Sequence, residues 1–360
     1  MKYIGRLLGW ILLGVNGMVV LFLLFSAYSP YIDPQEYSLL SCAGLAFPIF
    51  LFLNLLFLLF WLLVYRRYML LPILAFVCCW DAVRTYFPIN ISVGEKPEQA
   101  IKFLSYNTMA FGFGQRHTKE SPNATLAYLA GSGADIICVQ ECIWMGKINQ
   151  KEVNYALRDY KYKHYYPLLD KLNGLSVYSK YPILSAKPIE YGSHLNGSIA
   201  YRIKVGEDTL LVVNNHLESN KIAESDKEIY LNMMDEPNKQ NLETGSRLLL
   251  KKLAEASAIR SKQADAVAKV VDEFKGQGVI VCGDFNDSPI SYSHRVIGEN
   301  LYDAFVESGN GLGISYNRNR FYFRIDHILM SKSLEAYECT VDRSIKASDH
   351  YPIYCYFTIK

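Results

Sequence analysis

The chain has 360 residues, 51% of them hydrophobic, and its formal net charge is +2 at pH 7. So small a charge argues against an enzyme that tracks long nucleic acid through a strongly basic surface, although a local basic groove is compatible with it. The eight cysteines show no repeated C-x-x-C spacing, which argues against a structural zinc site. The apolar excess lies in about the first 90 residues, so the length suits one large domain preceded by a short apolar segment.

Three apolar runs open the chain, over about residues 7–28, 39–65 and 68–88. A bilayer core of about 30 Å needs about 20 apolar residues in a helix. The first two runs meet this length, whereas Asp81 interrupts the third. We interpret residues 1–94 as a membrane anchor with two to three transmembrane helices. A signal peptide is the weaker interpretation, because the first run is long and a second follows it closely.

Basic residues predict the orientation of this anchor. Lys2 and Arg6 precede the first run, Arg66 and Arg67 lie between the second and the third, and the first loop has neither Lys nor Arg. By the positive-inside rule, both basic segments face the cytoplasm. Three crossings then place residues 95–360 on the extracytoplasmic side of a multi-pass membrane protein. If the third run does not cross, these residues lie in the cytoplasm.

Beyond a linker at about residues 95–99, the pattern changes to short apolar strands, turns and amphipathic helices. The expected strands cover residues 101–106, 136–140, 174–178, 198–205, 210–214, 279–282, 324–330 and 353–358, and the expected helices cover 123–132 and 246–274. Strands and helices do not alternate strictly, so we expect an α+β domain over residues 95–360, in which sheet packs on sheet with helices outside.

Polar residues at the ends of these strands are candidates for a functional site, because strands hold side chains rigidly at one rim. Asn107 closes the first strand, Glu141 follows the second, and His216 comes shortly after the strand 210–214. Each residue alone is weak evidence. A single Glu after a strand is usually solvated, and a single His is more often structural than catalytic.

Two further pairs of polar residues follow the same rule. Asp284 and Asn286 come directly after the strand 279–282 and share one face in an extended backbone, so one could orient water while the other donates to an oxyanion. An Asx turn is the alternative interpretation. Asp326 and His350 lie next to the last two predicted strands, where a carboxylate could fix the imidazole tautomer and raise its basicity.

Together these segments resemble the endonuclease/exonuclease/phosphatase family over about residues 101–360. The resemblance is carried by Ser105-Tyr106-Asn107, Gln140-Glu141, Asn214–Ser219, Gly283–Pro289, Arg324–His327 and Ser348–Pro352. It implies a DNase I-like four-layer α/β sandwich and an enzyme that hydrolyses phosphoester bonds with Mg²⁺ or Mn²⁺. Family members include DNase I-like nucleases, apurinic-site endonucleases, inositol polyphosphate phosphatases and neutral sphingomyelinases.

The resemblance also implies a role for each residue. The metal would be held by three oxygen-bearing side chains, namely Glu141 with Asn107 beside it and Asp349 nearby. The catalytic groups would be His216 at the scissile phosphate, Asp284 at the attacking water, Asn286 at the developing charge, and Asp326 paired with His350, which would bind or polarise the phosphate.

The substrate class stays open between nucleic acid, a phospholipid headgroup and a phosphorylated metabolite. Nuclease-like hydrolysis at a membrane surface is the leading interpretation, a sphingomyelinase-like or inositol-phosphate phosphodiesterase or phosphatase is the alternative, and a non-catalytic scaffold is the remote one. Two segments are candidates for substrate contacts, the polar stretch 220–244 and the arginine- and aromatic-rich stretch 316–324. Arg260 and Gln263 interrupt the apolar stripe of the helix 246–274 and could point toward the site. The sequence indicates no protein partner.

Overall fold

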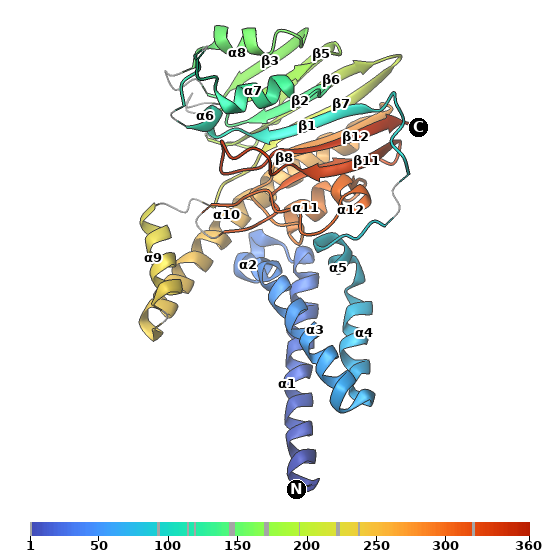
Figure 1. The fold of residues 1–360 in the computed structure, drawn as a ribbon, viewed down its shortest axis with the longest axis vertical. Coiled ribbons are helices and arrows are strands. Elements are labelled where there is room, and N and C mark those ends of the chain that lie inside the picture. The colour runs from blue at the N-terminus through green and yellow to red at the C-terminus, as the bar shows by residue number, and fades with distance from the viewer. Residues whose placement is uncertain are drawn as a thin grey trace.

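We analysed a computed structural model of the chain, which describes all residues except 1, 92–93, 114, 119, 144–147, 169–172, 194, 221–223, 237 and 319–320. The side chains of residues 2–5, 224, 225 and 227 are likewise left aside. A stalk of N-terminal helices projects from a body of two sheets flanked by helices (Figure 1). Residues 221–223, in the predicted polar stretch 220–244, and Arg320, in the stretch 316–324, therefore lie outside the description.

Two six-stranded mixed sheets form the centre of the body, in the orders β11-β12-β1-β2-β4-β3 and β5-β6-β7-β8-β10-β9. The strands are β1 Ile101–Asn107, β2 Ile136–Gln140, β3 Tyr162–Pro167, β4 Gly174–Ser179, β5 Ile183–Pro188, β6 Gly197–Val205, β7 Asp208–His216, β8 Gly278–Asp284, β9 Tyr302–Asp303, β10 Asp326–Met330, β11 Leu334–Val341 and β12 Ile353–Ile359.

The central strands of each sheet are buried on both faces, which gives four layers. Phe103 and Ile280 point into the core between the sheets, whereas their neighbours Leu104 and Val281 pack against the outer helices. The helices of the body are α6 Met109–Gly112, α7 Ala124–Gly131, α8 Gln150–Ala156, α9 Glu224–Asp235, α10 Lys239–Glu273, α11 Tyr292–Ile297 and α12 Ala304–Ser308. The predicted α+β sandwich is therefore confirmed.

The stalk consists of α1 Lys2–Tyr28, α2 Pro34–Ser41, α3 Phe47–Val64, α4 Leu70–Cys78 and α5 Trp80–Tyr86. Two segments, Arg6–Tyr31 and Pro34–Val64, are long and apolar enough to cross a membrane. Their polar side chains turn inward, since the buried Trp61 indole donates to Asn16 Oδ1 at 2.9 Å and Asn54 donates to the Pro72 carbonyl at 3.2 Å. Such inward pairing leaves apolar side chains on the outside of the stalk.

The two later apolar runs differ from their expected form. A 3₁₀ segment, Cys42–Ala46, divides the predicted span 39–65 into α2 and α3, and Pro48 lies in the first turn of α3. The predicted span 68–88 is a pair of helical segments, Arg66–Cys78 and Trp80–Tyr86, bent by 70°. A run of apolar residues shows that a segment is hydrophobic, but it does not show whether the helix in that segment is bent.

The stalk is packed directly against the body. Arg324 of the body donates to the Thr85 carbonyl, Arg295 donates to the Pro30 carbonyl at 2.8 Å, and Arg84 forms an ion pair with Glu307 at 2.8 Å. Because these contacts come from several points of the stalk, they fix the end of the stalk nearest the body relative to the body.

Gly44 marks the closest approach between the two parts. A Cβ at Gly44 would lie 2.1 Å from the backbone oxygen of Ile290. We expect Gly44→Ala to force the stalk away from the body and to destabilise the protein by about 1–3 kcal/mol, as overpacking does. Thermal unfolding of the full chain in detergent measures this, with Gly14→Ala as the control because a Cβ there meets nothing within 4 Å. Equal melting temperatures for both variants would contradict this packing.

Two predictions made along the body are corrected by the structure. The helix predicted over 246–274 begins earlier, as α10 from Lys239, where the Asn238 side chain caps it by accepting from the Asn241 backbone N–H at 2.9 Å. The polar stretch 220–244 is therefore partly helical, and α9 precedes α10. The strand predicted over 324–330 begins at Asp326. Sequence patterns also missed β3, β5, β9 and β11, since β3 and β5 are partly exposed edge strands without a continuous apolar run.

Candidate active site

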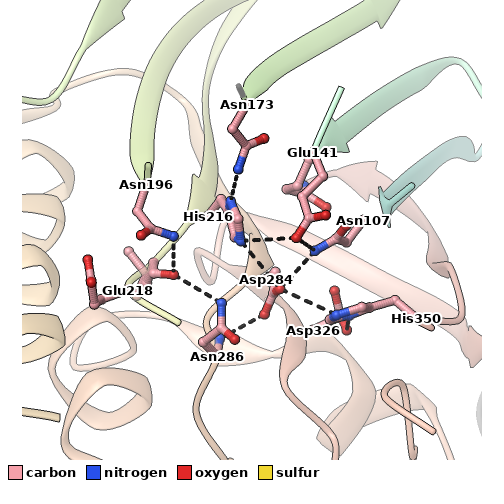
Figure 2. A network of polar contacts seen from close by, with 12 residues as sticks. Asn107, Glu141, Asn173, Asn196, His216, Glu218, Asp284, Asn286, Asp326 and His350 are labelled. Carbon is pink, nitrogen blue, oxygen red and sulfur yellow. Dashed lines mark hydrogen bonds and ion pairs between the residues drawn. The ribbon is translucent and has the colours of Figure 1, made fainter. Parts of the chain in front are cut away.

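The strand ends bring the predicted residues to one rim. β1 pairs in parallel with β2, so Asn107 lies beside Gln140 and one residue from Glu141. β7 pairs in parallel with β8 in the second sheet, which sets His216 opposite Asp284. Parallel strands end at a common edge, and the two sheets face each other, so both sets meet in one cluster (Figure 2).

Asn107 joins the two sheets at this cluster. Its amide donates to Glu141 Oε1 at 3.2 Å and to Asp284 Oδ2 at 3.0 Å (Figure 2). Burial raises the pKa of both carboxyl groups, and the charge of His350 only partly offsets this. Two carboxylates thus share one amide donor, and the Glu141 side chain is 34% exposed at the cluster's edge. The arrangement leaves negative charge that a cation would stabilise.

Asp326 and His350 form the predicted pair. Asp326 Oδ2 lies 2.8 Å from His350 Nδ1, and His350 Nε2 lies 3.6 Å from Asp284 Oδ2 (Figure 2). Burial alone would lower the pKa of His350, but the charges of Asp326 and Asp284 outweigh it and raise that pKa well above its usual value. His350 therefore presents an imidazolium N–H toward Asp284 and the rim.

His216 differs from His350 in charge. The Asn173 amide nitrogen donates to the Leu195 carbonyl and lies 3.1 Å from His216 Nδ1, so Nδ1 is the acceptor and Nε2 carries the proton. Burial lowers the pKa of His216, and Asp284 only partly counters this. A neutral imidazole thus points its Nε2–H at Glu141 Oε1, 3.6 Å away, and at Asp284 Oδ2, 3.8 Å away (Figure 2).

Asn286 adopts a left-handed backbone conformation, with φ of 51°. This turn lets its backbone N–H donate to Asp284 Oδ1 at 2.8 Å, which is the Asx-turn contact weighed from the sequence. Its side-chain amide donates to the Leu217 carbonyl at 3.0 Å, the same oxygen that Asn196 contacts at 2.9 Å. The turn and the cluster contact are therefore parts of one arrangement rather than alternatives.

Asp349 lies at the edge of the same cavity. Its carboxylate is 3.7 Å from Arg318 and accepts from Ser348 Oγ at 3.4 Å. Within the described part of the chain, it is the predicted site residue with an arginine as an ion-pair partner. Figure 2 draws the other seven together, with Asn173, Asn196 and Glu218 beside them.

Sequence reasoning missed several residues that hold the site in place. Asn173 and Asn196 lie in loops, where nothing in their local pattern distinguishes them from turn residues. Gln140 donates to Asn214 Oδ1 at 2.6 Å, and Asn214 donates to carbonyls of β2 and β4, so these two amides join the sheets behind the cluster. For Gln140, the feature that the sequence does show is a polar residue at the end of a buried strand.

Arg260 and Gln263 do point toward the site, the orientation that the sequence left open. Arg260 is buried, donates to the Glu218 carbonyl at 2.8 Å and lies 3.3 Å from Asp287. Gln263 accepts from the Glu218 backbone N–H at 2.7 Å. These side chains of α10 hold the loops that follow β7 and β8.

The residues present fit a hard divalent cation. Glu141 offers a partly exposed carboxylate, the kind of oxygen donor that Mg²⁺ and Mn²⁺ prefer. Asn107 faces Glu141 with its amide nitrogen, and its Oδ1 accepts from the Met109 N–H at 3.1 Å, so this side chain would have to turn to offer a second oxygen. The raised pKa of Glu141 indicates charge that lacks compensation. Donor atoms of Asp284, Asp326 and His350 also lie within 4.8 Å of one another. A metal cation is disfavoured among these three groups, because the negative charges of Asp284 and Asp326 keep His350 protonated and positively charged.

A second cluster, His294, Asp303 and His327, lies apart from the rim. His294 Nε2 is 3.1 Å from Asp303 Oδ2, and the guanidinium of Arg324 lies 4.0 Å from the same oxygen. Arg324 is buried and already supplies the positive charge that Asp303 needs. We therefore interpret this cluster as a structural ion-pair network. Because Arg324 is buried in this network, this residue of the stretch 316–324 is not available to contact phosphate.

Comparison with known proteins agrees with this geometry. Residues 104–350 match the model of the Endonuclease/Exonuclease/phosphatase family, and residues 9–86 match a domain of unknown function, DUF8431. No match was found among curated proteins.

Solved structures show the same fold at low sequence identity. TDP2 of D. rerio complexed with single strand DNA product is 18% identical, with a TM-score of 0.51 over 72% of this chain and 100% of that chain. The human Nocturnin catalytic domain with bound sulfate anion is 17% identical, with a TM-score of 0.51 over 72% and 94%. An endonuclease/exonuclease/phosphatase from Bacteroides vulgatus is 14% identical, with a TM-score of 0.51 over 73% and 100%. With its strand-end cluster and a family match that covers most of its length, this chain belongs to the endonuclease/exonuclease/phosphatase family and is a hydrolase of phosphoester bonds.

Proposed function

We propose that this enzyme hydrolyses phosphodiester bonds at a membrane surface with the help of a divalent metal ion. The observation that carries the proposal is the cluster itself. It combines the partly exposed carboxylate of Glu141, the buried carboxylate of Asp284, the neutral imidazole of His216 and the protonated imidazole of His350. All four side chains line a single cavity. This set can bind an anionic phosphate and accept a proton from water at the same rim.

Glu141 and Asn107 would hold the metal ion, with Asp349 beside them. A bound Mg²⁺ or Mn²⁺ would neutralise charge on the phosphate oxygens. Among the chain's own groups, Asp284 would accept the proton of the attacking water, and the imidazolium of His350 would bind a phosphate oxygen. His216 would donate its Nε2–H to the phosphate, a role that its neutral tautomer allows.

Asn286 would stabilise the developing charge. Its side-chain amide has two N–H groups, and one of them is donated to the Leu217 carbonyl. Its backbone N–H holds Asp284 Oδ1 at 2.8 Å, which orients the proton acceptor. Asn286 would therefore combine a contact to phosphate with control of the Asp284 carboxylate.

The stalk would cross the membrane three times. Trp10 of α1 packs near Tyr68 at the start of the third helical segment, and Tyr28 at the other end of α1 donates to the Cys78 carbonyl at 2.7 Å. α1 and α4 therefore run in the same direction and α3 returns between them. The N-terminus and the Arg66–Arg67 turn lie at the end of the stalk away from the body (Figure 1). By the positive-inside rule, this arrangement supports a body on the extracytoplasmic side.

Nucleic acid and lipid remain the two substrate classes to separate. A solved relative, TDP2, holds a single strand DNA product, which favours a nuclease. Stacking of bases on exposed aromatics would support it further. However, Phe321 already stacks on Tyr230, with ring centroids 4.3 Å apart. The second candidate, a lipid phosphoesterase, is favoured by the apolar side chains in the lining of the cavity.

Metal dependence tests the proposal. We expect the full chain in detergent to hydrolyse bis(p-nitrophenyl) phosphate, to lose this activity with EDTA and to regain it with Mg²⁺ or Mn²⁺. Glu141→Ala should lower both metal affinity, measured by calorimetry, and turnover, the latter by about 10²-fold or more. Glu207→Ala, at an exposed turn, is the matched control and should behave as the wild type. Full activity in EDTA would contradict the proposal.

A further inference from the structure

The cluster opens into a cavity of about 1030 Å³ whose two ends differ in chemistry. One end contains the charged groups of Glu141, His216, Asp284 and His350. The other part of the wall, formed by the stalk, α9 and α10, is mostly apolar. It presents Leu45, Ile49, Met233, Leu249 and Leu253, together with hydroxyl groups such as those of Ser41 and Ser257 and the engaged Arg260. The volume lies at the upper end of the range of about 300–1,000 Å³ typical of ligand sites. A ligand that fills this cavity must be amphipathic.

The stalk forms one wall of this cavity. Ser41 at the end of α2 contacts Ser257 of α10, with hydroxyl oxygens 3.4 Å apart, and Gln35 donates to Asp265 at 3.3 Å. These contacts hold Leu45 and Ile49 beside the leucines of α10. The wall therefore belongs to the site itself rather than to a separate membrane tether. An enzyme whose stalk served only as a membrane tether would not need stalk residues in the wall of its cavity.

The apolar end of the cavity lies where the stalk meets the body. α9 and the first turns of α10 extend from the body on the same side as the stalk (Figure 1). These helices also expose large apolar side chains, with Met234 50% and Leu242 and Leu250 each 44% exposed. With the stalk in a bilayer, this end would lie at the membrane surface, so hydrocarbon could enter it without crossing water.

The described residues of this lining do not match a nucleic acid strand. Its backbone needs cationic side chains along its length, and Arg260, on the cavity wall, is already engaged by Asp287 and the Glu218 carbonyl. A hydrocarbon chain matches it well, because burial of each methylene against leucine and isoleucine side chains is favourable. A phosphoester at the polar end would then lie within the catalytic cluster.

We propose that the substrate is a membrane lipid that carries a phosphoester headgroup, with the headgroup at Glu141 and His350 and the hydrocarbon chain between the stalk and α10. This inference rests on the proposed phosphoesterase function. It assigns Leu45, Ile49, Leu249 and Leu253 as the residues that determine specificity for lipid. Water would cleave the phosphorus–oxygen bond, so that one oxygen of the diester leaves with a proton and the phosphorus gains a hydroxyl.

The test compares two substrates of one enzyme. The full chain in mixed micelles is assayed on phosphatidylglycerol, phosphatidylethanolamine and sphingomyelin, and on water-soluble bis(p-nitrophenyl) phosphate. We expect Leu253→Glu, and separately Leu45→Glu, to lower kcat/KM for the hydrolysed lipid at least about tenfold more than for the soluble diester, because only the lipid uses the apolar wall. Ile259→Glu is the matched control, since it introduces the same charge at an exposed position of α10 outside the cavity and should change neither activity.

A binding measurement makes the inference independent of turnover. Phosphatidylglycerol with a diazirine in its acyl chain should, after irradiation, label residues 39–49 and 249–253. A fatty acid with the same diazirine, which lacks the phosphate, should label them less. Turnover of neither substrate would contradict the proposed phosphoesterase function. Hydrolysis of the soluble diester or of single-stranded DNA, without lipid turnover and without labelling of these segments, would contradict the lipid inference alone.

Discussion

Asp284→Asn is expected to reduce kcat on bis(p-nitrophenyl) phosphate by about 10²–10⁴-fold, the range that general-base catalysis contributes. Asparagine keeps the shape of the side chain, but its single oxygen can accept from only one of the Asn107 amide and the Asn286 backbone N–H, and it cannot take a proton from water. The measurement is steady-state turnover at saturating Mg²⁺, with Asp208→Asn at the start of β7 as the control. A variant that keeps more than about a tenth of the activity would show that another group is the base.

Stability separates this catalytic effect from misfolding. Burial raises the pKa of Asp284 above its usual value, so the folded protein binds the proton more tightly than the unfolded chain does. At neutral pH the ionised carboxylate therefore lowers the free energy of unfolding, and this penalty disappears as the pH falls through the folded pKa. In EDTA, the wild type should therefore lose this penalty as the pH falls from 7 toward the usual carboxyl pKa, whereas Asp284→Asn, which has no carboxylate there, should show no such gain from this position. Chemical denaturation at a series of pH values measures the difference, and an equal pH dependence in both proteins would contradict a burial penalty on the ionised Asp284.

His350→Ala is expected to cost about 10²–10³-fold in turnover, because it removes a positive N–H donor from the rim. The Asp326 carboxylate lies 2.8 Å from His350 Nδ1, and its charge raises the pKa of that imidazole. Asp326→Asn removes this charge and should therefore have a similar effect. The two residues act as a unit, so the double variant should be little worse than either single variant. Multiplied losses would show that the two residues act independently.

Another buried His–Asp pair in the described part of the chain is the control for this effect. His294 lies 3.1 Å from Asp303, as part of the network with Arg324 and away from the catalytic rim. We expect His294→Ala to lower the thermal stability and to leave the specific activity of the folded fraction close to that of the wild type. A loss of turnover equal to that of His350→Ala would mean that the effect comes from loss of structure rather than from the rim.

By itself the sequence determined the elements and the chemical groups of this protein. Apolar runs of the right length predicted the helices of the stalk, and short apolar runs predicted the central strands, because both signals depend on neighbouring residues. Asn107, Glu141, His216 and Asp284 could be recognised because each ends or follows a buried strand. The edge strand β3 could not, since its residues are only partly buried or exposed and its pattern is mixed.

Only the tertiary structure decided how these groups combine. The charge states of His216 and His350 depend on burial and on partners that lie far apart in the chain: Asn173 sets the tautomer of the first, and Asp326 the charge of the second. The wall that Leu45 and α10 build together could not be predicted from the sequence either. It arises because the stalk packs against the body at Gly44, where it meets Ile290, more than 200 residues later in the chain. Local patterns carry no information about such distant contacts, and here these contacts define the cavity.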